Sequence, residues 1–117
     1  MTDLKEADVK RAVEDYLQLL RNQKKLWFTR LNSGNAFKEF GGRRYRIKLC
    51  DEGTADYLVI TMDDFLYEET TEAIFLEIKS AKGKQSGKQK EFQAEVEEQG
   101  CSYFVVRSLE EVEGLLE

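Results

Sequence analysis

The sequence predicts an α/β fold: a central mixed β-sheet flanked by helices, formed by one domain over residues 1–117. Its length of 117 residues is close to the usual size of a single domain, so we expect one hydrophobic core. A hydrophobic content of 41% beside 35% charged residues is typical of a globular protein. Helix-like and strand-like segments follow in the order α-β-β-β-β-α-β-α, which favours a sheet with helices packed on it.

The chain begins with a segment of helical periodicity. Residues 4–21 repeat apolar side chains at helical spacing with charges between them, which predicts an amphipathic helix. Asp3 followed by Glu6 resembles a capping box that would set the start of this helix. Residues 26–31 alternate and are rich in aromatics, which predicts a strand.

The middle of the chain is strand-like. Residues 37–40 and 43–49 flank Gly41-Gly42, and we expect a hairpin because paired glycines supply the positive φ of a tight turn. Residues 56–62 are almost continuously apolar at their centre, as in a strand inside a sheet. Residues 63–71 are interpreted as an acidic connection.

The last third alternates strands and helices. Residues 73–79 predict a buried strand and 80–87 a loop rich in Gly, Ser and Lys. Residues 88–99 predict a helix that ends at Gly100, and 101–106 a further strand. A capping box and four apolar side chains predict a final short helix: Ser108, Glu111, Leu109, Val112, Leu115 and Leu116.

Composition excludes several kinds of chemistry. The chain has no histidine, which removes His-based general-base catalysis and histidine–metal sites. Two cysteines, Cys50 and Cys101, are too few for structural zinc, and we expect both to be reduced core residues in strands. No apolar run is long enough for a membrane span, and the charged N-terminus does not resemble a signal peptide, so we expect a cytoplasmic protein that does not engage a membrane.

Acidic and basic residues are segregated along the chain. The net charge of −5 by itself argues against a nucleic-acid partner. Residues 38–48, however, contain five basic residues and one acid, and 79–90 contain five lysines and no acid. From residue 95 onward there are seven glutamates against one arginine. Either one face of the protein binds phosphates, or the charge runs are ordinary solvated surface.

One group of polar residues indicates a reactive site. Glu77 and Lys79 are two apart in a predicted strand, so their side chains share a face, while Ile78 points into the core. Asp56 follows a glycine-containing turn and begins a second strand. If the two strands pair, two carboxylates converge beside a lysine. Two carboxylates, a main-chain carbonyl and water suit Mg²⁺ or Mn²⁺, which can activate water for attack on a phosphodiester.

This pattern resembles the PD-(D/E)XK nuclease superfamily, whose signature is D…(D/E)-x-K. Within it, the chain is similar to the virus-type replication-repair nuclease (VRR-NUC) branch, in its stand-alone form. The resemblance rests on Glu6 in the first helix, Gly53 to Asp56, Glu77 to Lys79, and Gln89 in the run S-G-K-Q-K-E-F. It implies a restriction-endonuclease-like core. Ala55 stands where the superfamily has proline, which supplies no ligand, so metal binding remains expected.

The resemblance also implies roles. Asp56, Glu77 and the carbonyl of Ile78 would bind Mg²⁺ or Mn²⁺, Lys79 would act on the attacking water, and Glu6 and Gln89 would support the site. The expected activity is DNA endonuclease cleavage, selective for branched DNA such as four-way (Holliday) junctions, by a homodimer. Residues expected to contact DNA lie in the hairpin and after the E-x-K strand: Arg43, Arg44, Tyr45, Lys82, Lys84 and Lys88.

Other readings remain open at this point. Glu6 could serve only to cap its helix, Gln89 could cap the second helix or lie in solvent, and Asp56 could be a turn residue. Glu77 and Lys79 could form a surface pair worth roughly 0.2–1 kcal/mol. At the level of function, the alternatives are a non-catalytic nucleic-acid-binding or interaction module on the same fold, and an exonuclease with the same active site.

Overall fold

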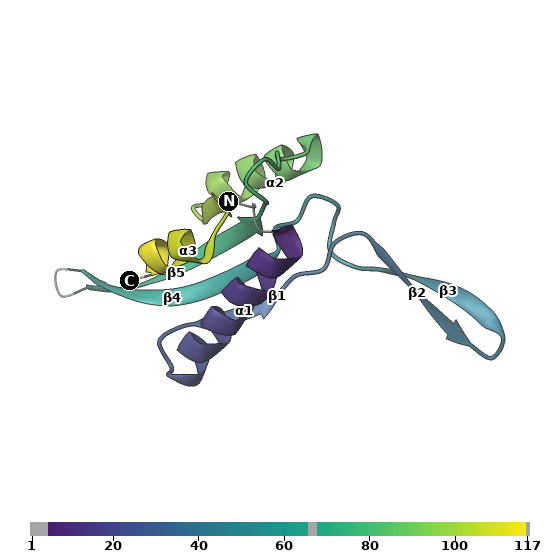
Figure 1. Cartoon of the computed structure of the whole chain (residues 1–117), viewed down its shortest axis with the longest axis horizontal. Coiled ribbons are helices and arrows are strands. Elements are labelled where there is room, and N and C mark those ends of the chain that lie inside the picture. The colour runs from purple at the N-terminus through teal and green to yellow at the C-terminus, as the bar shows by residue number, and fades with distance from the viewer. Residues whose placement is uncertain (1–4, 66–67, 117) are drawn as a thin grey trace.

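The structure, a computed structural model, describes residues 5–65 and 68–116 (Figure 1). Within these ranges three helices and six strands follow one another in the chain: α1 (Glu6–Asn22), β1 (Trp27–Arg30), β2 (Asn35–Phe40), β3 (Arg43–Lys48), β4 (Tyr57–Phe65), β5 (Glu68–Ile78), α2 (Gly87–Glu98), β6 (Ser102–Val106) and α3 (Leu109–Leu116).

The main sheet has four strands in the order β1-β4-β5-β6. Strand β4 is antiparallel to both of its neighbours, β1 and β5, whereas β6 is parallel to β5 because α2 carries the chain back across the sheet. The sheet is therefore mixed, with helices packed on it, as the sequence predicts.

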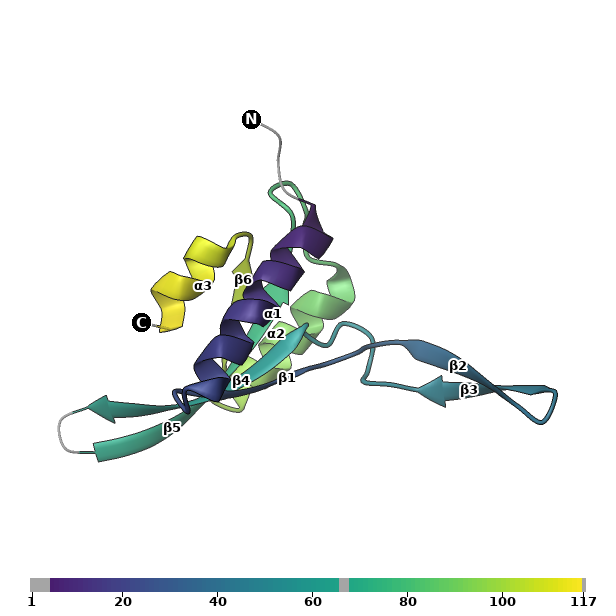
Figure 2. The ribbon, with the colours of Figure 1, turned by 60° about the horizontal axis from the view of Figure 1, so that its bottom comes forward.

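The two faces of the sheet are covered unequally. The helices α1 and α3 pack on one face, where the core contains Val13 and Leu17 of α1, Leu76 and Ile78 of β5, and Val112 of α3. In Figure 2, α1 lies in front of the sheet and α2 behind it. The ring of Phe92 in α2 packs edge-on against Phe75, with ring centroids 5.1 Å apart, and 6.1 Å from the Tyr103 ring.

The strands β4 and β5 form a longer hairpin than the sequence predicts. Pairing continues out to Phe65 and Glu68, so the expectation that residues 63–71 form a connection is wrong. The acidic composition of this segment suggested a loop. A hairpin is held by hydrogen bonds between the backbones of its two strands, so β4 and β5 can stay paired beyond the end of the hydrophobic core. Residues 66 and 67 lie outside the described part.

The strands β2 and β3 form a separate two-stranded sheet that projects from the body (Figures 1 and 2). We call residues 35–48 the arm. The predicted hairpin is confirmed: Gly41 and Gly42 have φ of +59° and +78°, the values that a type I′ turn needs at both central positions. The arm contributes to a Cα radius of gyration of 16.2 Å, against roughly 13 Å for a compact domain of about this size.

Two local predictions are corrected. The residue before α1 is Lys5, which makes no side-chain cap, and Glu6 is the first helical residue instead of the third as a capping box begun by Asp3 would require. Asp3 lies outside the described residues. Cys50 and Cys101 are free and half-buried, but neither lies inside a named strand or belongs to the core.

The C-terminal cap is close to its prediction. The backbone N–H of Glu111 donates to Ser108 Oγ, and the Glu111 carboxylate accepts from the N–H of Arg107 instead of that of Ser108. In the described part of the chain, no helix is long and apolar enough to span a bilayer.

Candidate active site

Asp56 and Glu77 are brought together by the register of β4 and β5. Tyr57 of β4 pairs with Leu76 of β5 in an antiparallel register. Asp56, just before Tyr57, and Glu77, just after Leu76, are therefore the next residues to face each other across the two strands. Asp56 Oδ2 accepts a hydrogen bond of 2.7 Å from the backbone N–H of Ile78. The expected convergence of two carboxylates across paired strands is confirmed.

The turn before Asp56 depends on Gly53. This residue has φ of +91°, and a Cβ built on it would lie 2.4 Å from the backbone oxygen of Lys88, at the start of α2. Glycine is therefore required both by conformation and by the close approach of the two backbones. On the other side, the carbonyl of Asp56 accepts from the N–H of Leu31 at 2.8 Å. The turn fixes the position of Asp56 between α2 and the chain leaving β1.

Glu77 is a buried carboxylate, with 3% of its surface exposed. Its Oε1 atom accepts from Gln89 Nε2 at 3.0 Å and lies 3.9 Å from Lys79 Nζ. Its Oε2 atom is buried and has no hydrogen-bond partner among the described residues. Burial first, and then the charge of Asp56, raise the pKa of Glu77 from 4.5 to about 8.

Gln89 combines two roles that the sequence left as alternatives. It is the N3 residue of α2, and its Oε1 accepts from the N–H of Ser86 at 2.8 Å, while Ser86 Oγ accepts from the N–H of Gln89. This is a capping box. The other end of the same amide, Nε2, donates to Glu77. The capping bond thus fixes the orientation in which Gln89 holds the carboxylate.

Lys10 is a site residue that the sequence reasoning missed. Its Nζ lies 3.2 Å from Asp56 Oδ1 and 3.5 Å from Glu6 Oε2. Burial lowers the pKa of Lys10, but the charges of Asp56 and Glu6 outweigh that effect and raise it overall. Lys10 lies one helical turn after Glu6, and this spacing could have predicted that the two side chains pair. Glu6 thus reaches the candidate site through Lys10.

The residues present fit a divalent metal. Within the described residues, no three His, Cys, Asp or Glu side chains gather to form a metal site. The oxygen atoms that could hold a cation here belong to Asp56, to Glu77 and to the carbonyl of Ile78, where β5 ends. All three are oxygen donors, as Mg²⁺ and Mn²⁺ prefer. The buried Oε2 of Glu77 lacks a donor among the described residues, and either a proton shared with Asp56 or a cation would satisfy it.

The six basic and aromatic residues expected to contact DNA lie in three places. Arg43, Arg44 and Tyr45 are exposed on the arm, away from the carboxylates. Lys82 and Lys84 are exposed in the loop after β5, which Arg107 holds by donating to the carbonyls of Ser80 and Gly83. These two lysines lie in the loop that begins just after Lys79. The sixth residue, Lys88, is exposed at the start of α2 and pairs with Glu91 at 3.5 Å.

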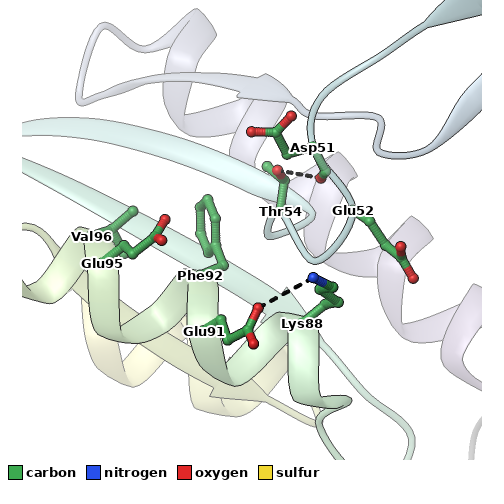
Figure 3. A pocket seen from close by; sticks show the side chains of 8 residues that line it. All are labelled: Asp51, Glu52, Thr54, Lys88, Glu91, Phe92, Glu95 and Val96. Carbon is green, nitrogen blue, oxygen red and sulfur yellow. Dashed lines mark hydrogen bonds and ion pairs between the residues drawn. The ribbon is translucent and has the colours of Figure 1, made fainter.

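A pocket of about 430 Å³ beside α2 is distinct from this carboxylate pair (Figure 3). It is lined by four acidic side chains, Asp51, Glu52, Glu91 and Glu95, and by Thr54, Lys88, Phe92 and Val96. The acidic lining repels phosphate. An anionic ligand is therefore disfavoured in this pocket.

Comparisons with protein-family models, with curated proteins and with solved structures find no match to this chain.

Proposed function

We propose that this protein is a Mg²⁺- or Mn²⁺-dependent DNA endonuclease of the PD-(D/E)XK type, similar to the VRR-NUC branch and selective for branched DNA. One observation carries the proposal: Asp56 and Glu77 meet across two strands, and Glu77 is buried with Lys79 and Gln89 as its partners. Two adjacent carboxylates are unfavourable unless a proton or cation neutralises one of them. A divalent cation, with Lys79 alongside, suits phosphodiester hydrolysis without histidine.

Each side chain has a definite task in this proposal. When bound, the metal supplies Lewis-acid polarisation of the phosphate and activation of water. Asp56, held by the Ile78 N–H, and Glu77, held by Gln89, supply two of its ligands. The Lys79 ammonium orients the attacking water and stabilises the negative charge that develops on the phosphate.

Lys10 acts as the counter-charge to Asp56 in the metal-free protein. Metal binding at Asp56 competes with this ion pair, because both cations are drawn to the same carboxylate. Released from Asp56, the Lys10 ammonium can still pair with Glu6. In this proposal, Glu6 supports the site by pairing with Lys10 when Lys10 leaves Asp56.

The substrate and the assembly state follow from the resemblance. Stand-alone members of the family are associated with branched DNA and with homodimers. A chain with one active site cuts one strand, whereas resolving a four-way junction requires two symmetric cuts. A homodimer acting on a junction satisfies that requirement.

The decisive experiment is cleavage of a labelled four-way junction and of a matched linear duplex, in Mg²⁺, in Mn²⁺ and in EDTA. Glu77→Gln keeps the shape of the side chain and removes its charge, so cleavage should be lost. Glu72→Gln is the matched control: it lies on the same strand and contacts Ser102, not the site. Metal-dependent symmetric nicking, lost only in Glu77→Gln, supports the proposal.

Other results would favour the alternatives. Tight binding in EDTA with no cleavage in either metal would identify a non-catalytic binding module. Cleavage of linear DNA from its ends, with circular DNA left intact, would identify an exonuclease. Retention of full activity by Lys79→Ala would contradict the mechanism, whatever the substrate.

A further inference from the structure

The arm concentrates positive charge on an otherwise acidic protein. Residues 35–48 contain five basic residues and one acid, a net charge of +4, so the rest of the chain carries −9 of the total of −5. All side chains of the arm are exposed except the half-buried Ala36. The arm therefore contributes nothing to the hydrophobic core, and its basic and aromatic side chains are available for contact with a partner.

The arm also exposes aromatic side chains. Phe40 is 77% exposed, Phe37 55% and Tyr45 48%. Phe40 is the last residue of β2 and adjoins the Gly41-Gly42 turn, so it stands at the tip of the ribbon. Large apolar side chains exposed together on a projecting element usually mark a contact surface.

Strand register distributes these residues over both faces of the ribbon. Phe40 pairs with Arg43, and Lys38 pairs with Tyr45, so these four share one face. The opposite face carries Phe37 beside Arg44 and Arg46, with the Arg44 guanidinium 4.1 Å from the Phe37 ring centroid. Each face thus offers both cations and an aromatic ring. A partner with phosphates and stackable rings matches this combination.

The root of the arm is tied to the candidate active site. Backbone hydrogen bonds join Cys50 N to Asn32 O at 2.8 Å and Leu49 N to Gly34 O at 3.0 Å. One leg leaves β1 beside Leu31, whose N–H binds the carbonyl of Asp56. The other leg returns into the turn containing Gly53, which packs on Lys88. A ligand held by the arm is therefore positioned relative to Asp56.

We propose that the arm binds branched DNA: its basic side chains hold phosphates, and Phe40 at its tip stacks on a base at the branch point. This rests on the proposed function and deepens it by naming the feature of DNA that is recognised. A two-stranded ribbon fits the width of the major groove, and apolar side chains can wedge between bases that are weakly stacked. Bases at a junction are easier to unstack than those in a continuous duplex, which gives selectivity for branches.

The test measures binding in EDTA, where no metal-dependent cleavage occurs, by fluorescence anisotropy of a four-way junction and a linear duplex of matched sequence. Arg43→Gln with Arg46→Gln removes two cations for which the structure gives no ion pair among the described residues. This double variant should weaken binding to both DNAs and lower the salt slope by about 2. Lys24→Gln with Lys25→Gln makes the same charge change on the body and should have little effect.

The proposed stacking of Phe40 on a base is tested with substitutions at this position. Phe40→Ala should weaken binding to the junction roughly tenfold, about the loss of one base–aromatic stack, and affect duplex binding much less. Phe40→Trp should restore it, and 2-aminopurine placed at the branch point should change fluorescence with wild type but not with Phe40→Ala. Far-ultraviolet circular dichroism and thermal unfolding confirm that each variant is folded.

The remaining outcomes would contradict either the role of the arm or the proposed function. Equal weakening by the arm and body double variants, or unchanged junction binding in Phe40→Ala, would overturn the proposal. So would arm variants that dissociate a dimer in sedimentation while keeping DNA affinity, since the arm would then hold a second copy. If the wild type cleaves the junction and the arm variants bind it normally, the proposed nuclease function stands and the proposed role of the arm is wrong. If binding depends on the arm but no metal supports cleavage, the role of the arm stands and the proposed nuclease function is wrong.

Discussion

At the scale of single residues, the candidate site is defined by an imbalance of charge at Glu77. The carboxylate is buried, its Oε2 has no hydrogen-bond partner in the described part of the chain, and its nearest cation, Lys79 Nζ, is 3.9 Å away. Asp56, in contrast, has Lys10 at 3.2 Å and the Ile78 N–H at 2.7 Å. The two carboxylates are neighbours in unequal environments, and burial beside Asp56 favours the protonated form of Glu77.

The raised pKa of Glu77 predicts how stability depends on pH in the metal-free protein. The folded carboxyl keeps its proton up to about pH 8, whereas the unfolded one loses it near 4.5. Its contribution is therefore full below about pH 4.5 and is lost as pH rises through 8, with a slope approaching about 1.4 kcal/mol per pH unit. Urea unfolding in EDTA from pH 4 to 9 measures this against Glu77→Gln. Parallel curves for the two proteins would contradict the prediction.

Lys10 predicts a second residue-scale effect, on metal affinity. Lys10→Met removes the cation that pairs with Asp56, so Mn²⁺ meets less electrostatic opposition. At 4 Å a unit charge contributes about 1 kcal/mol in a water-like medium, so the dissociation constant should fall about fivefold or more. Isothermal titration with Mn²⁺ checks this. Arg11→Met is the control on the next, exposed position of α1; weaker Mn²⁺ binding in Lys10→Met would show that Lys10 supports metal binding instead of competing with it.

At the scale of elements, the site is positioned by where turns and helices meet. The Gly53 turn packs directly on the start of α2, and α2 presents Gln89 to Glu77. The capping box that begins the helix therefore also orients a site residue. The loop after β5, held by Arg107, carries Lys82 and Lys84 on from Lys79.

The Gly53 contact predicts a large effect from a small substitution. Gly53→Ala places a Cβ 2.4 Å from the Lys88 backbone oxygen in a conformation with positive φ, so the turn must move. The backbone conformation alone should cost about 1–3 kcal/mol of unfolding free energy. Gly87→Ala is the matched control, because it has open space and lies in the first turn of α2, where alanine is favoured. Chemical denaturation compares the two; similar stabilities would contradict the assigned packing.

At the scale of the whole molecule, the protein is a body with a hydrophobic core and an arm without one. An isolated two-stranded hairpin is marginally stable in water. This one is held at its root by backbone hydrogen bonds and by the pair Lys48–Asp51 at 3.3 Å. The division of stability between body and arm is therefore expected to be very uneven.

Removing the arm tests that division. Replacing residues 35–48 with Asn-Gly joins Gly34 to Leu49, which are already hydrogen-bonded. The thermal midpoint should change by no more than about 4 °C, equivalent to roughly 1 kcal/mol, because no arm side chain belongs to the core. Differential scanning calorimetry measures it. Loss of a cooperative transition would show that the arm stabilises the body after all.

The sequence by itself determined the local features of this protein. Helical and alternating periodicity located the helices and most strands, Gly41-Gly42 located the arm's turn, and the two-residue spacing of Glu77 and Lys79 placed them on one face. These features depend on neighbours within a few positions, so they can be read from the residues alone. The acidic segment 63–71 was misread because backbone pairing with a partner strand overrides local composition.

The tertiary structure decided what gathers around the carboxylates. The β4–β5 register set Asp56 across from Glu77, the packing of α1 brought Lys10 to Asp56, and the approach of α2 to the Gly53 turn brought Gln89 to Glu77. The residues of each pair are separated by at least twelve positions in the chain. Their meeting is fixed by sheet register and helix packing, which arise from burial of the whole core and not from any local pattern.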